Sequence, residues 1–88
     1  MTSDLHLDVS ELAAPEPLER VLAALQTLTR GAYLRVVHRR QPQCLFGILD
    51  GMGFRHAWRL DAESRVQIWI WRGDDVDAQR AAELAAKE

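Results

Sequence analysis

Two prolines, Pro15 and Pro17, constrain the fold of this chain more than any other feature of its sequence. Proline breaks the interior of a helix or a sheet, because it lacks a backbone N–H, but it suits the first turn of a helix. Before the prolines, apolar and polar residues alternate over residues 5–9, which predicts a strand with one buried face. After them, leucine and valine recur at helical spacing. We therefore expect a helix over about residues 17–29, ended by Gly31.

The rest of the chain divides into alternating and helical segments in the same way. Runs of β-branched and aromatic residues with a period of two predict strands, and glycines mark the end of a helix. The alanine-rich C-terminal segment carries few large apolar residues, so we expect only a short helix with frayed ends there. The further elements expected are strands over residues 32–38, 54–61 and 65–72, a helix opened by Pro42 and closed by Gly51 and Gly53, and the short helix over residues 76–87.

This order of elements, βαβαββ followed by a short helix, predicts the fold class. Two helices and four strands favour an α+β fold, a two-layer sandwich with both helices on one face of a four-stranded sheet. The first strand, helix and second strand should form a right-handed crossover between parallel strands, and the last two strands should form a hairpin. A chain of 88 residues, 48% of them hydrophobic, is enough for one such domain with one modest core.

The net charge of −2 hides an uneven distribution along the chain. Residues 30–72 carry eight arginines against three acids, whereas residues 1–29 and 73–88 are both acidic. The basic middle could draw an anionic partner, or the acidic ends could fold against it and neutralise it. No apolar run is long enough to span a bilayer, and residues 1–4 lack the basic-then-apolar pattern of a signal peptide. We therefore expect a cytoplasmic protein with no membrane contact.

A resemblance to a known family comes from the prolines and the residues around them. The stretch Leu5–Leu12, with the letters LHLDVSEL, is followed by Ala14-Pro15-Glu16-Pro17. Together these residues are similar to the strand, the link and the Cys-Pro-x-Pro helix start of TusA/SirA-type domains. The likeness continues through Gly31-Ala32-Tyr33-Leu34 and Gly53-Phe54 into the closing hairpin.

More specifically, the chain resembles a sister family of uncharacterised bacterial domains that keeps Pro-x-Pro without the cysteine and has a proline-containing link such as Arg39-Arg40-Gln41-Pro42. Those domains occur alone or beside hemerythrin-like and other redox modules. The resemblance covers residues 5–72 and leaves residues 73–88 as a C-terminal helical extension. It implies a mixed sheet with strand order 1-2-4-3, the fourth strand antiparallel to the rest, and a context in sulfur, redox or nitrogen-oxide metabolism.

In such a sheet both helices would begin at the carboxyl ends of neighbouring parallel strands, so their first residues would share one rim of the molecule. Helix starts present unpaired N–H groups that favour anions. The candidate ligand residues on this rim are Pro15, Glu16, Pro17, His38, Arg39, Arg40 and Pro42. Sulfur carriers hold a persulfide on the cysteine before Pro-x-Pro, and Ala14 excludes that chemistry at this position.

Cys44 is the only cysteine, so the chain can form neither an internal disulfide nor a multi-cysteine zinc site. It falls in the first turn of the helix that Pro42 opens, close in sequence to Arg39 and Arg40, and both surroundings favour a thiolate. It is therefore a candidate redox or sulfur-relay thiol, but a free cysteine is more often an inert, partly buried apolar residue. His38 could approach it, yet two ligands do not make a metal site, and we expect no metal.

The sheet face without helices is the second candidate surface. By alternation it should present Tyr33, Arg35, Arg55, Arg59, Trp69 and Trp71. Arginines among aromatics suit base stacking and phosphate contacts, but they suit a protein interface equally well. The acidic C-terminal helix could instead cover this face, or the arginines could stack on the tryptophans. Nucleic acid is the weaker interpretation because the chain is acidic, with a pI of about 5.9.

No nucleophile–base pair, phosphate-binding glycine loop or close pair of carboxylates stands out, so we expect neither an enzyme nor a cofactor. The sequence favours a non-catalytic accessory domain of the TusA/SirA-like fold that binds a protein partner or a small anion at the rim. Self-association or a protein partner is also expected at the open sheet face. The alternatives are a sulfur-relay or redox protein that uses Cys44, and a nucleic-acid binder that uses the arginine and tryptophan face.

Overall fold

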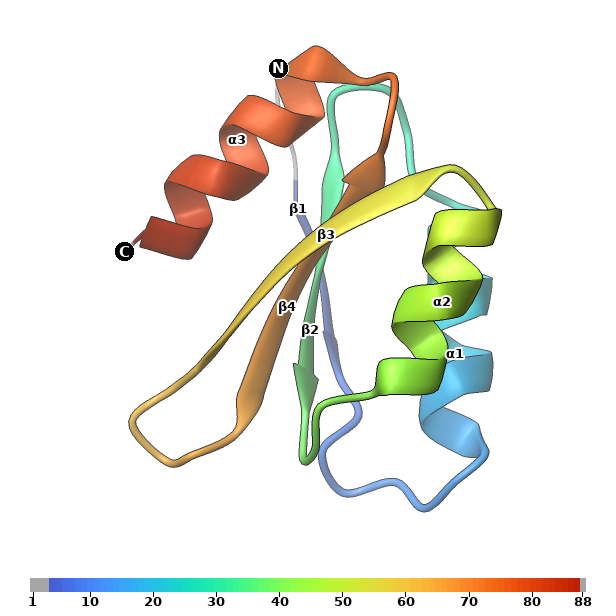
Figure 1. Ribbon diagram of the computed structural model, residues 1–88, viewed down its shortest axis with the longest axis vertical. Helices are drawn as coiled ribbons and strands as arrows, with labels where there is room; N and C mark the ends of the chain where they lie inside the picture. The colour runs from blue at the N-terminus through green and yellow to red at the C-terminus, as the bar shows by residue number, and fades with distance from the viewer. Residues whose placement is uncertain (1–3, 88) are drawn as a thin grey trace.

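The computed structural model describes residues 4–87, over which four strands and three helices follow in the expected order (Figure 1). The strands are β1 (Asp4–Asp8), β2 (Tyr33–His38), β3 (Phe54–Leu60) and β4 (Val66–Arg72). The helices are α1 (Glu16–Leu25), α2 (Gln43–Gly51) and α3 (Val76–Lys87). None of the helices in this part of the chain is long and apolar enough to cross a membrane.

The helix α1 ends four residues earlier than the leucine spacing predicts. After Leu25, the N–H groups of Gln26, Thr27 and Leu28 donate to the carbonyls three residues before them at 3.0–3.2 Å, so the chain tightens into a turn. The Thr27 hydroxyl also donates to the Ala24 carbonyl at 2.8 Å, a side-chain bond that competes with the helical pattern. Leu28 remains buried after this turn, which explains why its position still fits the helical spacing.

The sheet has the strand order β1-β2-β4-β3, as the resemblance implies. β1 runs parallel to β2, and β4 runs antiparallel to both of its neighbours, β2 and β3. In register, Leu7 lies beside Val36 of β2, and Val36 lies beside Ile68 of β4. Figure 1 shows α1 and α2 together on one side of the sheet and α3 on the other. The predicted α+β sandwich with a mixed sheet is therefore confirmed.

The main core lies between the sheet and the helices α1 and α2. On the sheet side, Val36, Ile68 and Ile70 are fully buried. They face the inner stripes of the two helices, in which Val21 and Leu49 are also fully buried. The period of two in the strands and the helical period in α1 and α2 thus meet at one apolar surface, as the sequence predicts.

The helix α3 forms over the residues expected of the C-terminal helix, 76–87, but it is regular rather than frayed, and it buries the second sheet face. Over its 12 residues it packs Ala78 and Ala82, both fully buried, against Tyr33, Trp69 and Trp71. Alanine carries little apolar surface and so gives a weak periodic signal, but its small side chain lets a helix lie close to the indole rings. The alternative in which the C-terminal helix covers this face is the one that the structure adopts.

Asp75 connects α3 to the turn before β2 through two hydrogen bonds. Its carboxylate accepts the N–H of Ala78 at 3.1 Å, which caps the helix, and the N–H of Gly31 at 2.7 Å, in the turn before β2. Gly31 has a φ of +85°, a conformation in which a residue with a Cβ is strained. Arg72 adds a second connection, since its guanidinium donates to the Leu28 carbonyl oxygen at 2.6 Å.

Removal of the Asp75 carboxylate should loosen α3. The N–H of Gly31, and then that of Ala78, hold the pKa of Asp75 below its ordinary value. The folded protein therefore binds this proton less tightly than the unfolded chain, so the stabilisation is complete above about pH 4 and is lost as the pH falls through the folded pKa. We expect Asp75→Ala to lower the Tm by roughly 5 °C at neutral pH, and the difference from wild type to close in acid.

Differential scanning calorimetry at neutral and acidic pH measures both effects. Asp74→Ala is the matched control, because Asp74 is the exposed neighbour of the buried Asp75. A Tm difference that persists unchanged in acid would show that the carboxylate does not hold α3 through these two amides.

Candidate functional site

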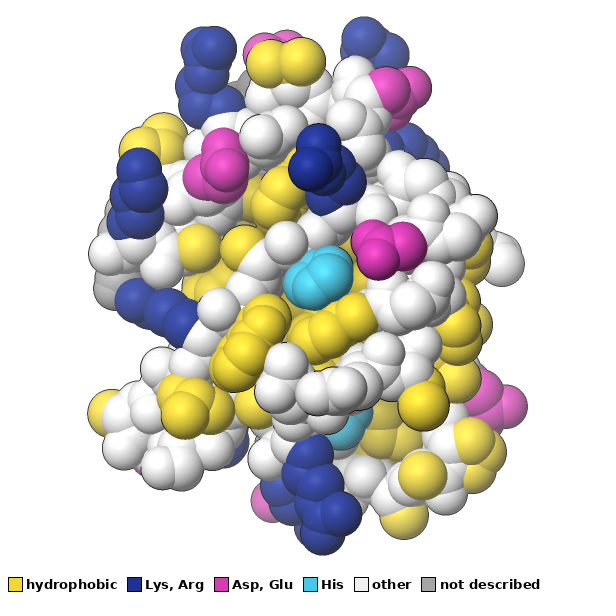
Figure 2. Space-filling view, viewed as in Figure 1, with side chains coloured by type: hydrophobic (Ala, Val, Ile, Leu, Met, Phe, Trp, Pro, Cys, Tyr) yellow, Lys and Arg dark blue, Asp and Glu magenta, His cyan; other side chains and the backbone are white. Residues whose placement is uncertain are grey.

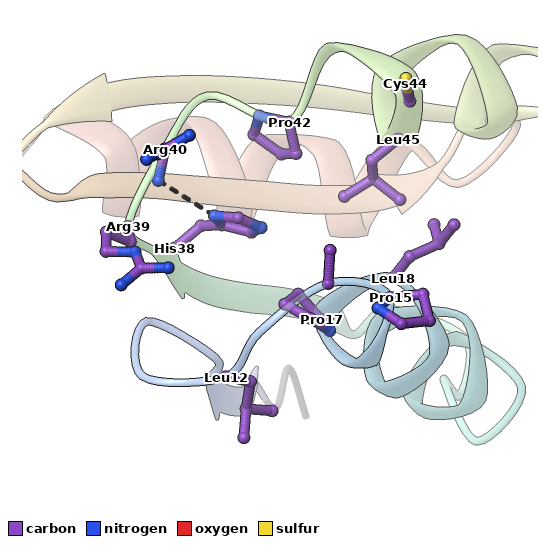
Figure 3. Close-up of a pocket in the computed structure, with 11 residues that line it drawn as sticks. Leu12, Pro15, Pro17, Leu18, His38, Arg39, Arg40, Pro42, Cys44 and Leu45 are labelled. Atoms are coloured by element: carbon purple, nitrogen blue, oxygen red, sulfur yellow. Dashed lines mark hydrogen bonds between the residues drawn. The ribbon is translucent and has the colours of Figure 1, made fainter.

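The candidate site lies at the carboxyl ends of β1 and β2. Because these strands are parallel neighbours, the loops that follow them, residues 9–15 and 39–42, emerge on the same rim of the sheet. A cavity of about 380 Å³ opens between the two loops and the first turns of α1 and α2 (Figure 3). Its lining consists of Leu12, Ala14, Pro15, Pro17, Leu18, His38, Arg39, Arg40, Pro42, Cys44 and Leu45.

Six of the seven rim residues predicted from the sequence line this cavity. The exception is Glu16, which is exposed and lies 3.9 Å from the Arg20 guanidinium, one turn further along α1. The sequence does not predict the apolar wall that Leu12, Leu18 and Leu45 form. Leu18 and Leu45 open the apolar stripes of their helices, and a stripe of that kind predicts core rather than the wall of a pocket.

His38 extends from the end of β2 into the space between the two loops (Figure 3). The backbone N–H of Arg40 donates to its Nδ1 at 3.1 Å, so the neutral ring carries its proton on Nε2. Burial, and then the charge of Arg39, hold the pKa of His38 below its ordinary value. At neutral pH the cavity therefore contains an uncharged imidazole whose Nε2–H can act as a donor.

Positive charge gathers on the α2 side of the cavity. Arg39 and Arg40 are exposed there, and in the described part of the chain neither forms an ion pair with a carboxylate. α2 begins at Gln43 with no side-chain cap and no acidic residue in its first turn. α1 also lacks a side-chain cap, but Glu16 and Glu19 in its first turn balance the positive end of its dipole. The start of α2 is thus the better place for an anion.

Cys44 lies in the first turn of α2, as predicted, and its side chain is exposed. It is therefore not the partly buried apolar residue that was the alternative. Figure 3 shows its sulfur directed away from His38, so the approach of His38 to this thiol that the sequence allows does not occur. Across residues 4–87, no group of three or more His, Cys, Asp or Glu side chains is placed to hold a metal ion.

The second candidate surface, the sheet face opposite α1 and α2, is not open as predicted. Trp69 and Trp71 are only 1% and 4% exposed under α3, and Tyr33 is also buried. Arg35 and Arg59 lie over the Trp69 ring, with their guanidinium carbons 6.0 and 5.5 Å from its centroid. The two alternatives, in which α3 covers this face and in which arginines stack on a tryptophan, therefore occur together. The covered indole faces offer no platform on which nucleic-acid bases could stack.

The fold and the cavity define a class of small α+β domain in which the loops after two parallel strands and the starts of two helices enclose a pocket on one rim. The chain belongs to the family of uncharacterised conserved proteins DUF2249, which matches residues 6–72. The match ends with β4, so α3 lies beyond it. No curated protein and no solved structure matches the chain.

The two causes of the low His38 pKa can be separated by removal of one of them. In Arg39→Ala the neighbouring charge is lost and the burial remains. The pKa of His38 should therefore rise and yet stay below its ordinary value, because burial is the larger cause. An NMR titration of the imidazole resonances measures this change. His56 on β3 is the internal reference, since burial lowers its pKa as well and Arg39 is not among the causes. A His38 pKa that does not rise would contradict the role assigned to Arg39.

Proposed function

We propose that this protein is a non-catalytic accessory domain whose rim pocket binds an anionic group carried on an apolar body, either a small molecule or part of a protein partner. The composition of the cavity carries the proposal. Leucine, proline and alanine side chains form most of its lining, and two arginines and a histidine supply its charge and hydrogen-bond donors. Pockets for small ligands have this character, a largely apolar lining with a few convergent polar groups.

The polar groups suit a carboxylate or a similar oxyanion. Arg39 and Arg40 supply exposed positive charge, and the uncapped start of α2 supplies backbone N–H groups. The Nε2–H of His38 can donate to the same anion without adding a charge. A volume of about 380 Å³ is enough for a phenyl ring or a branched chain together with its carboxylate.

The likeness to TusA/SirA-type domains supports the choice of this rim. Sulfur carriers of that kind hold their persulfide on the cysteine before Pro-x-Pro, and here Ala14 adds a methyl group to the lining of the pocket at that position. We infer that the rim has kept the role of receiving a partner or a ligand and has lost the nucleophile. A context in sulfur, redox or nitrogen-oxide metabolism belongs to the same inference.

Phenylacetate is a suitable probe because it joins an apolar ring to a carboxylate. In amide NMR titrations we expect saturable shifts at Leu18, His38 and Leu45, which line the pocket. Acetate lacks the ring and benzyl alcohol lacks the charge, so each should bind at least about tenfold more weakly. The double variant Arg39→Ala/Arg40→Ala should weaken phenylacetate binding by about tenfold or more.

The matched control is Arg80→Ala, which removes an exposed arginine from α3, on the opposite face of the sheet from α1 and α2. This variant should bind phenylacetate as the wild type does. Equal affinity for acetate and phenylacetate, or shifts scattered over the surface, would show that the pocket does not recognise an apolar-bodied anion.

A second candidate function rests on Cys44, an exposed cysteine among the residues that line the same pocket. In a sulfur relay, its thiolate would attack the outer sulfur of a donor protein's persulfide. A new S–S bond would form at Cys44, the S–S bond of the donor would break, and the donor would leave as a thiolate. The observation that favours this candidate is the position of Cys44, an exposed residue at the edge of a cavity that could hold part of the donor.

Intact-mass analysis after incubation with a protein persulfide tests the relay. We expect the mass of one added sulfur on the wild type, and none on Cys44→Ser, which is the control for other sites. A wild-type chain that stays unmodified while the donor remains loaded would remove this candidate, and it would leave the binding proposal unaffected.

A further inference from the structure

The strand β3 forms an edge of the sheet and carries an exposed apolar strip. It pairs with β4 on one side only. Trp58 and Leu60 of β3 are 41% and 60% exposed, and His56, on the same face, stacks its ring on Phe46 of α2 with the centroids 4.0 Å apart. Figure 2 shows apolar side chains gathered around a histidine on this side of the molecule. Proteins normally protect such edges, because other chains can pair with them.

The backbone of β3 also has hydrogen-bonding groups directed to the open side. At the two ends of the β3–β4 ladder, the Gly73 N–H donates to the Gly53 carbonyl, and the Asp61 N–H donates to the Arg65 carbonyl, each at 2.8 Å. The direction of hydrogen bonding alternates along an antiparallel strand. The odd-numbered residues of β3 therefore face β4, and the even-numbered residues, with Trp58 among them, direct their N–H and C=O groups outward.

We propose that β3 is a self-association surface, on which β3 of a second copy pairs antiparallel about a two-fold axis at Trp58. Trp58 then lies opposite Trp58 of the second copy, and His56 lies opposite Leu60, so outward-facing backbone groups meet outward-facing groups. The product is one continuous sheet, with α1 and α2 of both copies on the same side. This surface is separate from the rim pocket and from the sheet face that α3 covers.

The charges of β3 favour this register over the registers whose axis lies one residue earlier or later. An axis at Ala57 would place Arg55 opposite Arg59 of the second copy, and an axis at Arg59 would place two arginines opposite each other, which is unfavourable. An axis at Trp58 places Arg59 opposite the small side chain of Ala57 of the second copy. It places Arg55 opposite Asp61, whose carboxylate is already paired with Arg65 of its own chain at 3.1 Å. No two arginines are therefore opposite each other in this register, whereas they are in the registers centred on Ala57 and Arg59.

The same register buries the apolar strip. The two Trp58 rings meet across the axis, and each Leu60 packs beside His56 of the other copy. An axis at His56 would also keep the arginines apart, but it would leave Leu60 outside the paired segment. A second copy in this register therefore pairs the open backbone, covers the apolar side chains and keeps the arginines of β3 apart, which is why we choose it as the occupant.

Sedimentation equilibrium of the full chain over a range of concentrations tests the proposal. We expect a reversible monomer–dimer equilibrium. Trp58→Lys, which places a charge at the centre of the interface, should raise the Kd at least about tenfold. Leu60→Lys should also raise the Kd of the dimer. Leu84→Lys is the matched control, since Leu84 on α3 and Leu60 on β3 are both 60% exposed. The Kd of the Leu84→Lys dimer should equal that of the wild-type dimer. The Tm of each variant at low concentration shows whether its fold is intact.

Amide hydrogen exchange shows whether β3 is the interface. As the protein concentration rises, the amides of His56, Trp58 and Leu60 should become protected, whereas those of Ala57 and Arg59, which face β4, should not change. A wild-type chain that stays monomeric up to about 1 mM would overturn the proposal and leave the strip to a different partner. A dimer that Trp58→Lys and Leu60→Lys leave intact, or new protection confined to other elements, would also overturn it.

Discussion

The strand β4 is buried on both of its faces, and the other elements take their positions from it. Ile68 and Ile70 face α1 and α2, Trp69 and Trp71 face α3, and all four side chains are almost completely buried. Because successive side chains alternate between faces, a slip of one residue would turn both apolar sets away from their helices together. β2 and β3 occupy the two edges of β4, so the register of β4 determines which side chains every layer of the domain can bury.

The rim pocket follows from the parallel crossover that connects β1 to β2 through α1. β2 already pairs with β4, so β1 adds at the remaining edge of β2, and it runs parallel to β2 because α1 lies between them in the chain. The loops after both strands must then emerge on the same rim. Pro15 and Pro42 stand immediately before the first residues of α1 and α2, so both helices start next to that rim. The cavity is enclosed by segments whose position the topology already determines.

The sequence predicts the features that large side chains create and misses those that depend on small ones. Strand alternation and leucine spacing predict β1 to β4, α1 and α2, and the prolines and the parallel crossover predict the rim. Ala78 and Ala82 give little periodic signal, so the sequence does not show that α3 packs over Trp69 and Trp71. The strand order came from the family resemblance, since alternation alone does not say which strands are neighbours. Leu18 belongs to a core stripe by its spacing, and only the tertiary structure shows that it also lines the pocket.

The two helix starts that enclose the pocket differ in charge, and we infer that this difference orients any anion bound there. Glu16 and Glu19 stand in the first turn of α1, whereas α2 has no acid in its first turn and follows Arg39 and Arg40. A carboxylate is therefore drawn to the start of α2, and its apolar body is left toward α1 and Ala14. The start of α1 has two acids in its first turn, and the methyl group of Ala14 lies beside it in the pocket lining, so it is the less favourable end for an anion. The acids of the first helix and the arginines of the second loop thus act in the same direction, and both favour an anion at the start of α2.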